Sequence, residues 1–247
     1  MRGTSWARVA AIAQGVVADA LRRRVPYVVL AFAGLLAVAI PSLPSYNEGV
    51  DAAVYREVAL ALTFVAALVV TLSLTVNRVP SEIERRVVYS VLARPASRTE
   101  YVVGTWAGVA VVMGGLIGAF TLLEQALGLA VYGDPMWRLW QGALGVWMEV
   151  CVLSAFALAL SAATGAVAAA AGSLTLLFVG HSRSALLSEG SPLALVYPSL
   201  EAFNVIDPVA HGAGVQPAYV VTMVLAFAAW VIALLALAAL LFNRRDL

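Results

Sequence analysis

Residues 81–108 read SEIERRVVYSVLARPASRTEYVVGTWAG and form the longest charged interval between two hydrophobic runs of the chain. Apolar residues in its first half recur at the spacing of one helix face. They are Ile83, Val87, Val88, Val91 and Leu92. Pro95 ends this helical pattern, because proline cannot continue a helix, and Ser97 and Arg98 lead into the next hydrophobic run. The pattern predicts a short amphipathic helix in a polar loop, which is suited to docking on a soluble partner.

The composition is typical of a membrane protein that crosses the bilayer several times. Of the 247 residues, 62% are hydrophobic and only 12% are charged, whereas soluble domains are about half apolar and a quarter charged. The mean hydropathy is +0.93. A formal net charge of +1 gives no reason to expect a nucleic-acid partner. The single cysteine, Cys151, lies inside a hydrophobic run, so no disulfide framework is expected.

All fifteen basic residues are arginine, and the chain contains no lysine. The phosphate-binding loop of P-loop ATPases needs the lysine of its Gly-x-x-x-x-Gly-Lys pattern to reach the β- and γ-phosphates. If this protein uses ATP, the ATPase must therefore be another polypeptide. The chain also lacks an HExxH motif, a GxSxG motif and a spaced aspartate pair, so we predict that it is not an enzyme.

Six apolar runs are each about long enough to cross a membrane as a helix, which takes roughly 20 residues. They lie at 25–43, 54–77, 101–123, 138–161, 162–180 and 217–242. A turn of small residues around 161–165 separates the fourth run from the fifth, and its boundary stays open. Residues 2–24 predict an amphipathic helix lying at the membrane interface. We therefore expect an all-α membrane protein that forms a single transmembrane domain over residues 1–247.

The placement of arginine predicts the orientation of these spans. If both termini are cytoplasmic, twelve of the fifteen arginines lie on the cytoplasmic side, and only Arg56, Arg138 and Arg183 lie outside. The loop at 78–100 is then cytoplasmic, whereas the loops at 44–53, 131–137 and 181–216 are external. Short apolar pieces within 181–216 predict re-entrant or interfacial segments before the last span.

A few polar residues stand out within or beside the apolar runs. Glu149 falls near the middle of the fourth span, where a carboxylate costs about 2.5–3.5 kcal/mol on insertion scales. It either lines a transport pathway or contacts a cationic substrate, or else it is protonated or hydrogen-bonded to a neighbouring Ser or Thr. For Glu124, near the outer end of the third span, we expect an interfacial position. The two histidines, His181 and His211, lie thirty residues apart without a metal-ligand spacing, so no metal site is expected.

The stretch EIERR…VLARPASRTEYVVGTWAG resembles the segment that joins the second and third spans of type-2 ABC exporter permeases. The matching positions are Glu82, Glu84, Leu92, Pro95, Ser97, Arg98 and Gly104. Thr105 stands where the family usually has lysine, so a contact that depends on this lysine is not carried over. A second stretch, YPSLEAFNVIDPVAHG at 197–212, is similar to the one before the last span in the NosY-like subgroup, named after the nitrous-oxide-reductase maturation (Nos) system.

This resemblance implies that residues 81–95 form a coupling helix in a groove of a separate cytoplasmic ATPase subunit. Charged side chains there would transmit the closure of the ATPase to the second and third spans, and apolar ones would anchor the helix. The coupling residues implied are Glu82, Glu84, Arg85, Arg86, Val87, Val91, Leu92, Pro95 and Arg98.

The same resemblance implies a homodimer in the inner membrane of a prokaryote, assembled with two copies of the ATPase, and in contact with membrane lipid and a periplasmic accessory protein. ATP and Mg would be bound by the ATPase, and no cofactor by this chain. The work done would be export, or periplasmic maturation of a cofactor or enzyme; the substrate stays open. Two alternatives remain: a non-transporting scaffold of a periplasmic maturation complex, and an intramembrane enzyme that uses Glu149, His181 or His211.

Overall fold

The computed structural model describes residues 5–23, 25–42, 48–76, 78, 97–186 and 197–244. Within these residues all regular secondary structure is helical. The elements are α1 (Ser5–Arg23), α2 (Val25–Ser42), α3 (Glu48–Thr75), α6 (Arg98–Tyr132), α7 (Leu139–Ala163), α8 (Ala166–His181), α9 (Arg183–Leu186), η1 (Leu200–Phe203), α11 (Ile206–Ala210) and α12 (Pro217–Asn243). The prediction of an all-α protein is confirmed for the described part of the chain.

Among the described residues, four helices are long and apolar enough to cross a membrane, as expected of a membrane protein. They are Val50–Thr75 within α3, Arg98–Tyr132, Leu139–Ala163 and Pro217–Asn243. The apolar helices at Tyr27–Leu36, within α2, and at Ala166–His181 are shorter. Large apolar side chains remain exposed on the outside of the bundle, for example Val111 at 62% and Ile232 at 68%. A hydrocarbon solvent accounts for such exposure, because helices that face lipid gain nothing by hiding apolar groups.

Two helices begin earlier than the predicted spans, and the structure fixes the one boundary that the sequence left open. α3 begins at Glu48, so the predicted external loop at 44–53 is helical from residue 48 onward. α6 begins at Arg98, inside the predicted loop at 78–100. The open boundary between the fourth and fifth runs lies at Thr164, whose backbone N–H donates to the carbonyl of Leu160 at the end of α7.

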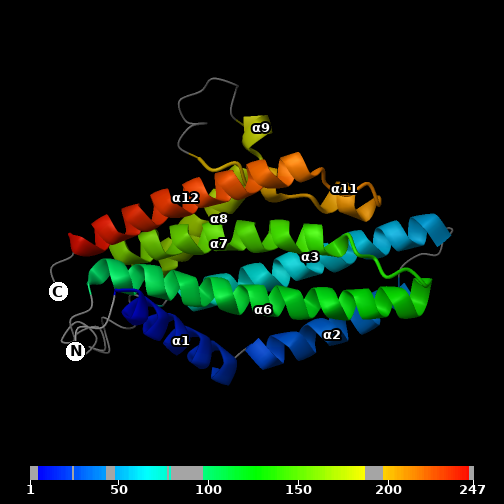
Figure 1. Ribbon diagram of the computed structural model, residues 1–247, viewed down its shortest axis with the longest axis horizontal. Helices are drawn as coiled ribbons and strands as arrows, with labels where there is room; N and C mark the ends of the chain where they lie inside the picture. The colour runs from blue at the N-terminus through cyan, green and yellow to red at the C-terminus, as the bar shows by residue number, and fades with distance from the viewer. Residues whose placement is uncertain are drawn as a thin grey trace.

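The helices α2, α3, α6, α7, α8 and α12 run in alternating directions along the long axis of the molecule (Figure 1). α7 lies between α6 and α12, and four consecutive residues near its centre, Val150 to Leu153, are fully buried. We call the end of the bundle where α6 begins and α12 ends the terminal end. The end where α6 ends and α7 begins is the distal end.

The first helix, α1, packs against the start of α6 through two glycines. Gly104 lies against Ile12 and Gly108 lies against Val16, so α1 runs along the first turns of α6 in the same direction. The two glycines are four residues apart and therefore share one face of α6. This small-xxx-small spacing lets two helix backbones approach closely. The helix predicted for residues 2–24 is thus present, and its buried face contacts α6.

The distal end is covered by short helices from the predicted external loop. Leu200 of η1 is fully buried and packs against Gly180 near the end of α8. The backbone of Phe203 lies directly against Gly145 of α7. In α11, Val209 and Ala210 are buried, and this helix packs on α3 and α7. The segment from 197 to 210 is therefore a packed part of the bundle.

We predict that Gly108→Ala weakens the packing of α1 on α6. A Cβ atom at Gly108 would lie 2.6 Å from the Cβ of Val16 and 2.8 Å from the carbonyl oxygen of Ala13, so the backbones must move apart. Overpacking of this kind costs about 1–3 kcal/mol. Thermal unfolding of the detergent-solubilised protein measures the effect.

Gly115→Ala is the matched control, because a Cβ atom there has no neighbour within 4 Å. Alanine in a helix interior is favoured over glycine by roughly 0.5–1 kcal/mol, so this variant should melt at the same temperature or higher. Equal melting temperatures for the two variants would show that the close approach of α1 and α6 does not limit stability.

Candidate functional site

Most of the predicted coupling residues lie outside the described part of the chain, which omits residues 79–96. They are Glu82, Glu84, Arg85, Arg86, Val87, Val91, Leu92 and Pro95. The described residues on the two sides of this segment are Arg78, after α3, and Ser97, before α6. Their contacts define how the segment is attached to the bundle.

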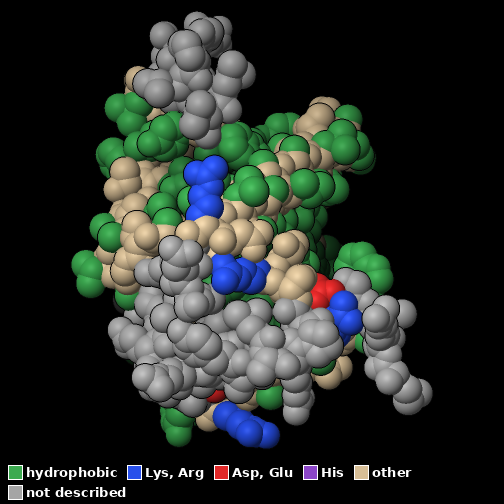
Figure 2. Space-filling model, turned by 90° about the vertical axis from the view of Figure 1, so that its left-hand side faces the viewer, with side chains coloured by type: hydrophobic (Ala, Val, Ile, Leu, Met, Phe, Trp, Pro, Cys, Tyr) green, Lys and Arg blue, Asp and Glu red, His purple; other side chains and the backbone are tan. Residues whose placement is uncertain are grey.

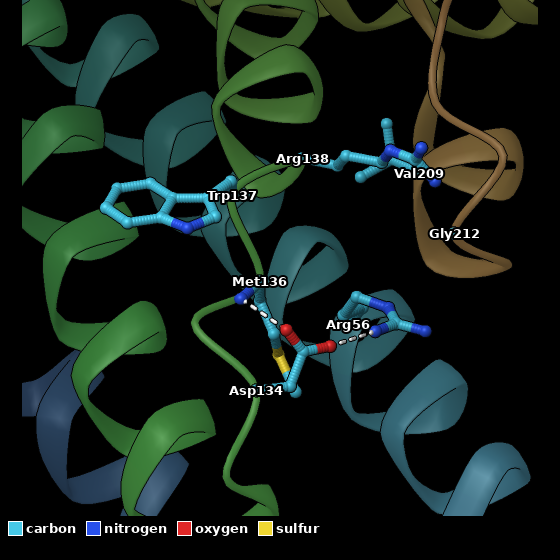
Figure 3. A pocket seen from close by; sticks show the side chains of 7 residues that line it. All are labelled: Arg56, Asp134, Met136, Trp137, Arg138, Val209 and Gly212. Atoms are coloured by element: carbon cyan, nitrogen blue, oxygen red, sulfur yellow. Dashed lines mark hydrogen bonds and ion pairs between the residues drawn. The ribbon is translucent and has the colours of Figure 1, made fainter.

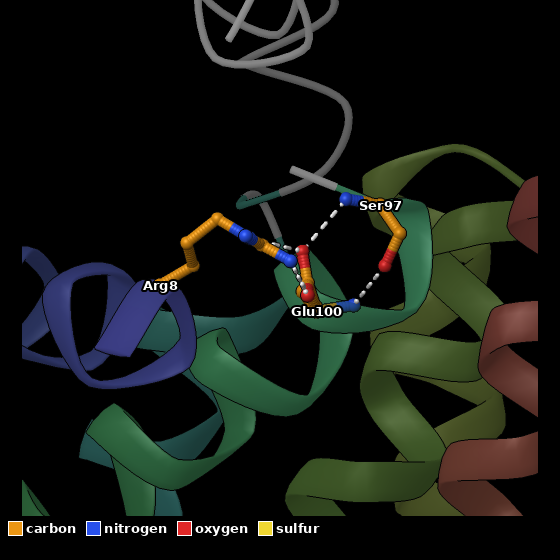
Figure 4. Close-up of polar contacts among 3 residues, drawn as sticks. All are labelled: Arg8, Ser97 and Glu100. Carbon is orange, nitrogen blue, oxygen red and sulfur yellow. Dashed lines mark hydrogen bonds and ion pairs between the residues drawn. The ribbon is translucent and has the colours of Figure 1, made fainter. Parts of the chain in front are cut away.

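The start of α6 is fixed by a capping box that also binds α1 (Figure 4). The backbone N–H of Glu100 donates to the Ser97 hydroxyl at 3.2 Å, and the Ser97 N–H donates to Oε2 of Glu100 at 2.9 Å. Arg8 of α1 donates to both oxygens of the same carboxylate through two of its guanidinium nitrogens. Its Nη2 lies 2.6 Å from Oε1 and its Nε lies 3.0 Å from Oε2.

One carboxylate therefore holds both the first turn of α6 and the helix α1. Glu100 is only 8% exposed, and charge-assisted pairs with bidentate geometry are the strong ones. The hydrogen bond to Glu100 raises the pKa of Arg8 above its ordinary value, so the guanidinium stays charged. α1 is held at this point by charge as well as by the packing on Gly104 and Gly108.

α1 is also paired with the other side of the undescribed segment. Asp19, three turns beyond Arg8, lies with its Oδ2 3.4 Å from Nη1 of Arg78. The Arg78 side chain is 23% exposed and the Asp19 side chain 40%, so solvent screens this pair more than the Arg8–Glu100 pair. α1 thus makes an ion pair on each side of residues 79–96. We call the two pairs, Arg8–Glu100 and Asp19–Arg78, the α1 clamp.

The predicted coupling residue Arg98 is described, and it binds the end of α12. Its Nη1 donates to the carbonyl oxygens of Phe242 at 2.8 Å and Asn243 at 3.1 Å. The guanidinium also lies 5.6 Å from the centre of the Phe242 ring. A cation suits this place, because the last carbonyls of a helix lack intrahelical partners and carry partial negative charge. α6 and α12 are therefore joined at the terminal end.

Charged and apolar side chains of the described residues lie side by side at the terminal end (Figure 2). Figure 2 faces this end and shows basic and acidic side chains beside hydrophobic ones. Thr105, where the resembled family has lysine, is only 1% exposed, and its hydroxyl has no hydrogen-bond partner among the described residues. A lysine here would bury its ammonium group at considerable cost. The departure from the family pattern therefore fits the local packing.

The candidate pathway residue Glu149 lies in the interior of the bundle and is 2% exposed. Its Oε1 lies 3.4 Å from Nδ1 of His181, at the end of α8, but has no hydrogen-bond partner among the described residues. The same Nδ1 is 3.3 Å from the carbonyl oxygen of Leu177. The other side of the imidazole approaches Phe64, with ring centres 5.8 Å apart. Glu149 and His181 thus form a polar pair in which the carboxylate is buried and the imidazole half-buried.

The histidine of this pair is partly exposed. The His181 side chain is 27% exposed. Beyond it, Ser184 donates from its hydroxyl to Oε1 of Glu201 at 2.8 Å, in the exposed loop region. Sequence reasoning singled out Glu149 and His181 separately. It had no signal to join them, because they lie on different helices.

A second buried carboxylate corrects an expectation. Glu124 was expected at the interface, but its side chain is fully buried between α6 and α3. Thr63 of α3 donates to its Oε1 at 2.5 Å, and Tyr55 donates to its backbone carbonyl at 2.6 Å. Its other oxygen, Oε2, has no hydrogen-bond partner among the described residues. The side chain of Glu124 is buried because it faces α3, where the hydroxyl groups of Thr63 and Tyr55 both donate to this residue.

Among the described side chains, no group of three or more His, Cys, Asp or Glu could hold a metal ion. His211 is 65% exposed and pairs only with Asp207 of its own helix turn, at 3.3 Å. It precedes Gly212, whose φ of 71° makes the turn at the end of α11. No protein-family model matches the chain, and no curated protein matches it in sequence.

We predict opposite stability effects at two buried carboxylates. Glu100→Gln should lower the melting temperature, because it removes a charge that accepts bonds from Arg8 and Ser97. Glu149→Gln should leave the melting temperature unchanged or raise it, because the Oε1 of Glu149 accepts no hydrogen bond from the part of the chain that the structure describes. Thermal unfolding of both variants beside the wild type measures this. A strong loss of stability in Glu149→Gln would mean that this carboxylate serves the fold.

Proposed function

We propose that this chain is the membrane-spanning permease subunit of an ATP-binding-cassette transporter of the type-2 exporter class. It pairs with a second copy of itself and with two copies of a separate ATPase subunit, which binds ATP and Mg. The complex lies in the inner membrane of a prokaryote and performs export or the periplasmic maturation of a cofactor or enzyme.

The observation that carries the proposal is the α1 clamp. Residues 81–95 resemble a coupling helix, and the clamp ties the residues on both sides of them to one helix. A push on the segment would therefore move the end of α3, the start of α6 and α1 together. Arg98 would extend the movement to the end of α12. An ordinary solvated loop has no need of ion pairs at both ends.

The arrangement of helices supports a path across the membrane with both termini in the cytoplasm. Four of the six proposed spans coincide with the long apolar helices, and the other two would be formed by the shorter apolar helices α2 and α8. The terminal end holds Arg8, Arg78, Arg98 and Arg244, whereas Arg56 and Arg138 lie at the distal end. An excess of arginine on one side favours a cytoplasmic position for that side.

Glu149 is the candidate for a role in the pathway. A carboxylate buried among membrane-spanning helices is a functional-site hypothesis by default, and Oε1 of Glu149 has no hydrogen-bond partner among the described residues. A Glu149→Gln protein that is as stable as the wild type but changes the ATPase activity of the assembled complex would support this role. Unchanged activity would remove Glu149 from the pathway.

The wild-type chain is expected to bring down an ATPase subunit when it is purified from detergent. The double variant Glu82→Arg, Glu84→Arg should lower the affinity for that subunit at least about tenfold, the equivalent of about 1.4 kcal/mol. Reversing two charges in a docking surface places like charges opposite each other. Binding of the reconstituted subunits measures the effect.

Glu57→Arg is the matched control, because Glu57 is an exposed glutamate near the distal end of α3. It should bind the ATPase as the wild type does. Absence of any ATPase from the purified complex, or equal affinity for the double variant and the control, would contradict the proposal.

Variants of the α1 clamp give a second test, which distinguishes binding of the ATPase from coupling to its activity. Arg8→Gln and Asp19→Asn should leave the affinity for the ATPase unchanged, because neither residue lies in the segment proposed to dock. Both variants should reduce the change in ATPase activity that accompanies assembly by about two- to thirtyfold. This range corresponds to the roughly 0.5–2 kcal/mol by which mutations of coupling residues change the coupling free energy.

Asp207→Asn is the control, since it removes an ion pair of similar length at the distal end. It should behave as the wild type in both measurements. Full coupling in both clamp variants would show that α1 takes no part in transmission.

A further inference from the structure

Two arginines from different elements line a pocket of about 240 Å³ at the distal end (Figure 3). Arg56 comes from α3, and Arg138 immediately precedes α7. The turn between α6 and α7 adds Asp134 and Trp137, and Gly212 comes from the turn after α11. Neither the pocket nor its arginines have a part in the proposed coupling of ATP hydrolysis.

The two guanidinium groups converge on one point beside Gly212. A Cβ atom at this glycine would lie 3.9 Å from Nη2 of Arg56 and 3.9 Å from Nη1 of Arg138. Gly212 has a φ of 71°, which side chains rarely adopt, so the glycine keeps this point open. One small ligand can therefore contact both cations.

Arg56 is held rigidly, whereas Arg138 is available. The Nε of Arg56 donates to the carbonyl oxygen of Ala210 at 2.8 Å, and its Nη1 lies 3.3 Å from Oδ2 of Asp134. Its side chain is only 13% exposed. The exposed side chain of Arg138 makes no hydrogen bond or ion pair with another described residue.

The pocket carries a net positive charge. Two guanidinium groups face one carboxylate, Asp134, which is 50% exposed and also accepts the backbone N–H of Met136 at 2.9 Å. Arg138 is the N-cap residue of α7. The dipole of this 25-residue helix adds to the positive field at its start. An anion is therefore the ligand that the site favours.

We propose that this pocket binds a phosphate group, from a phospholipid headgroup or from a soluble phosphate compound. The planar fork of arginine matches the oxygens of phosphate in a bidentate way. The volume is below the 300–1,000 Å³ of sites for drug-sized ligands, so a phosphate and its nearest atoms fit better than a large molecule. Trp137 and Trp140 are 71% and 41% exposed beside it, as aromatic residues at headgroup level are.

Native mass spectrometry of the detergent-solubilised full chain tests the proposal by counting bound lipids. Phosphatidylglycerol and phosphatidylcholine with identical acyl chains are the two lipid probes. The wild type should retain phosphatidylglycerol in preference, and Arg138→Gln should lower its affinity about tenfold, as expected for a lost charged hydrogen bond. Arg138→Lys, which keeps the charge without the fork, should restore part of the binding.

Arg183→Gln is the matched control, because Arg183 lies in α9 and does not line the pocket. It should bind phosphatidylglycerol as the wild type does. Melting curves show whether each variant is folded. If Arg138→Gln does not fold, the affinity of Arg138→Lys for phosphatidylglycerol, compared with that of the wild type, tests the proposal instead.

Titration with inorganic phosphate separates the two sources of the group. If phosphate does not displace phosphatidylglycerol and does not bind by itself, the site takes a lipid headgroup. If phosphate competes, or binds wild type and not Arg138→Gln, the site takes a soluble phosphate compound. Equal binding of both probes to wild type and Arg138→Gln would overturn the proposal.

Discussion

The contact of Arg8 with Glu100 is the interaction on which the terminal end depends. Glu100 completes the capping box of the longest helix, and the same carboxylate binds the guanidinium that holds α1 in place. Close packing at Gly104 and Gly108 then brings the two backbones together. The ion pair and the close packing act on the same turns of α6, so charge and van der Waals contact together position α1.

The buried polar side chains of this apolar bundle differ in where they find hydrogen-bond partners. Many hydroxyls bind a carbonyl one turn earlier in their own helix, as Ser173 binds Ala169 and Thr121 binds Ile117. Such groups need nothing from neighbouring helices. Glu149 differs, because its Oε1 is buried without a hydrogen bond among the described residues and faces a histidine from another helix. A group that the fold does not satisfy points to a role outside the fold.

Sequence alone predicted the helices well and their contacts poorly, for physical reasons. Long apolar runs identify spans, because each must cover about 30 Å of hydrocarbon. The start of α3 was missed because Glu48 and Asp51 extend the helix beyond its apolar part. Arg8 and Glu100 are 92 residues apart, and Thr63 and Glu124 are 61 apart. Nothing in the spacing of such residues indicates which arginine meets which glutamate.

The two ends of the bundle can influence each other only through whole helices. α6 is one continuous helix of 35 residues, so at 1.5 Å per residue it extends roughly 50 Å from the clamp to the turn that carries Asp134. The distal pocket is built from α3, this turn and α11. Since α3 and α6 also carry the two ends of the clamp, a movement of one helix relative to the other acts on the ion pair between Arg56 of α3 and Asp134, which follows α6. The pocket is therefore placed to respond to movement at the terminal end.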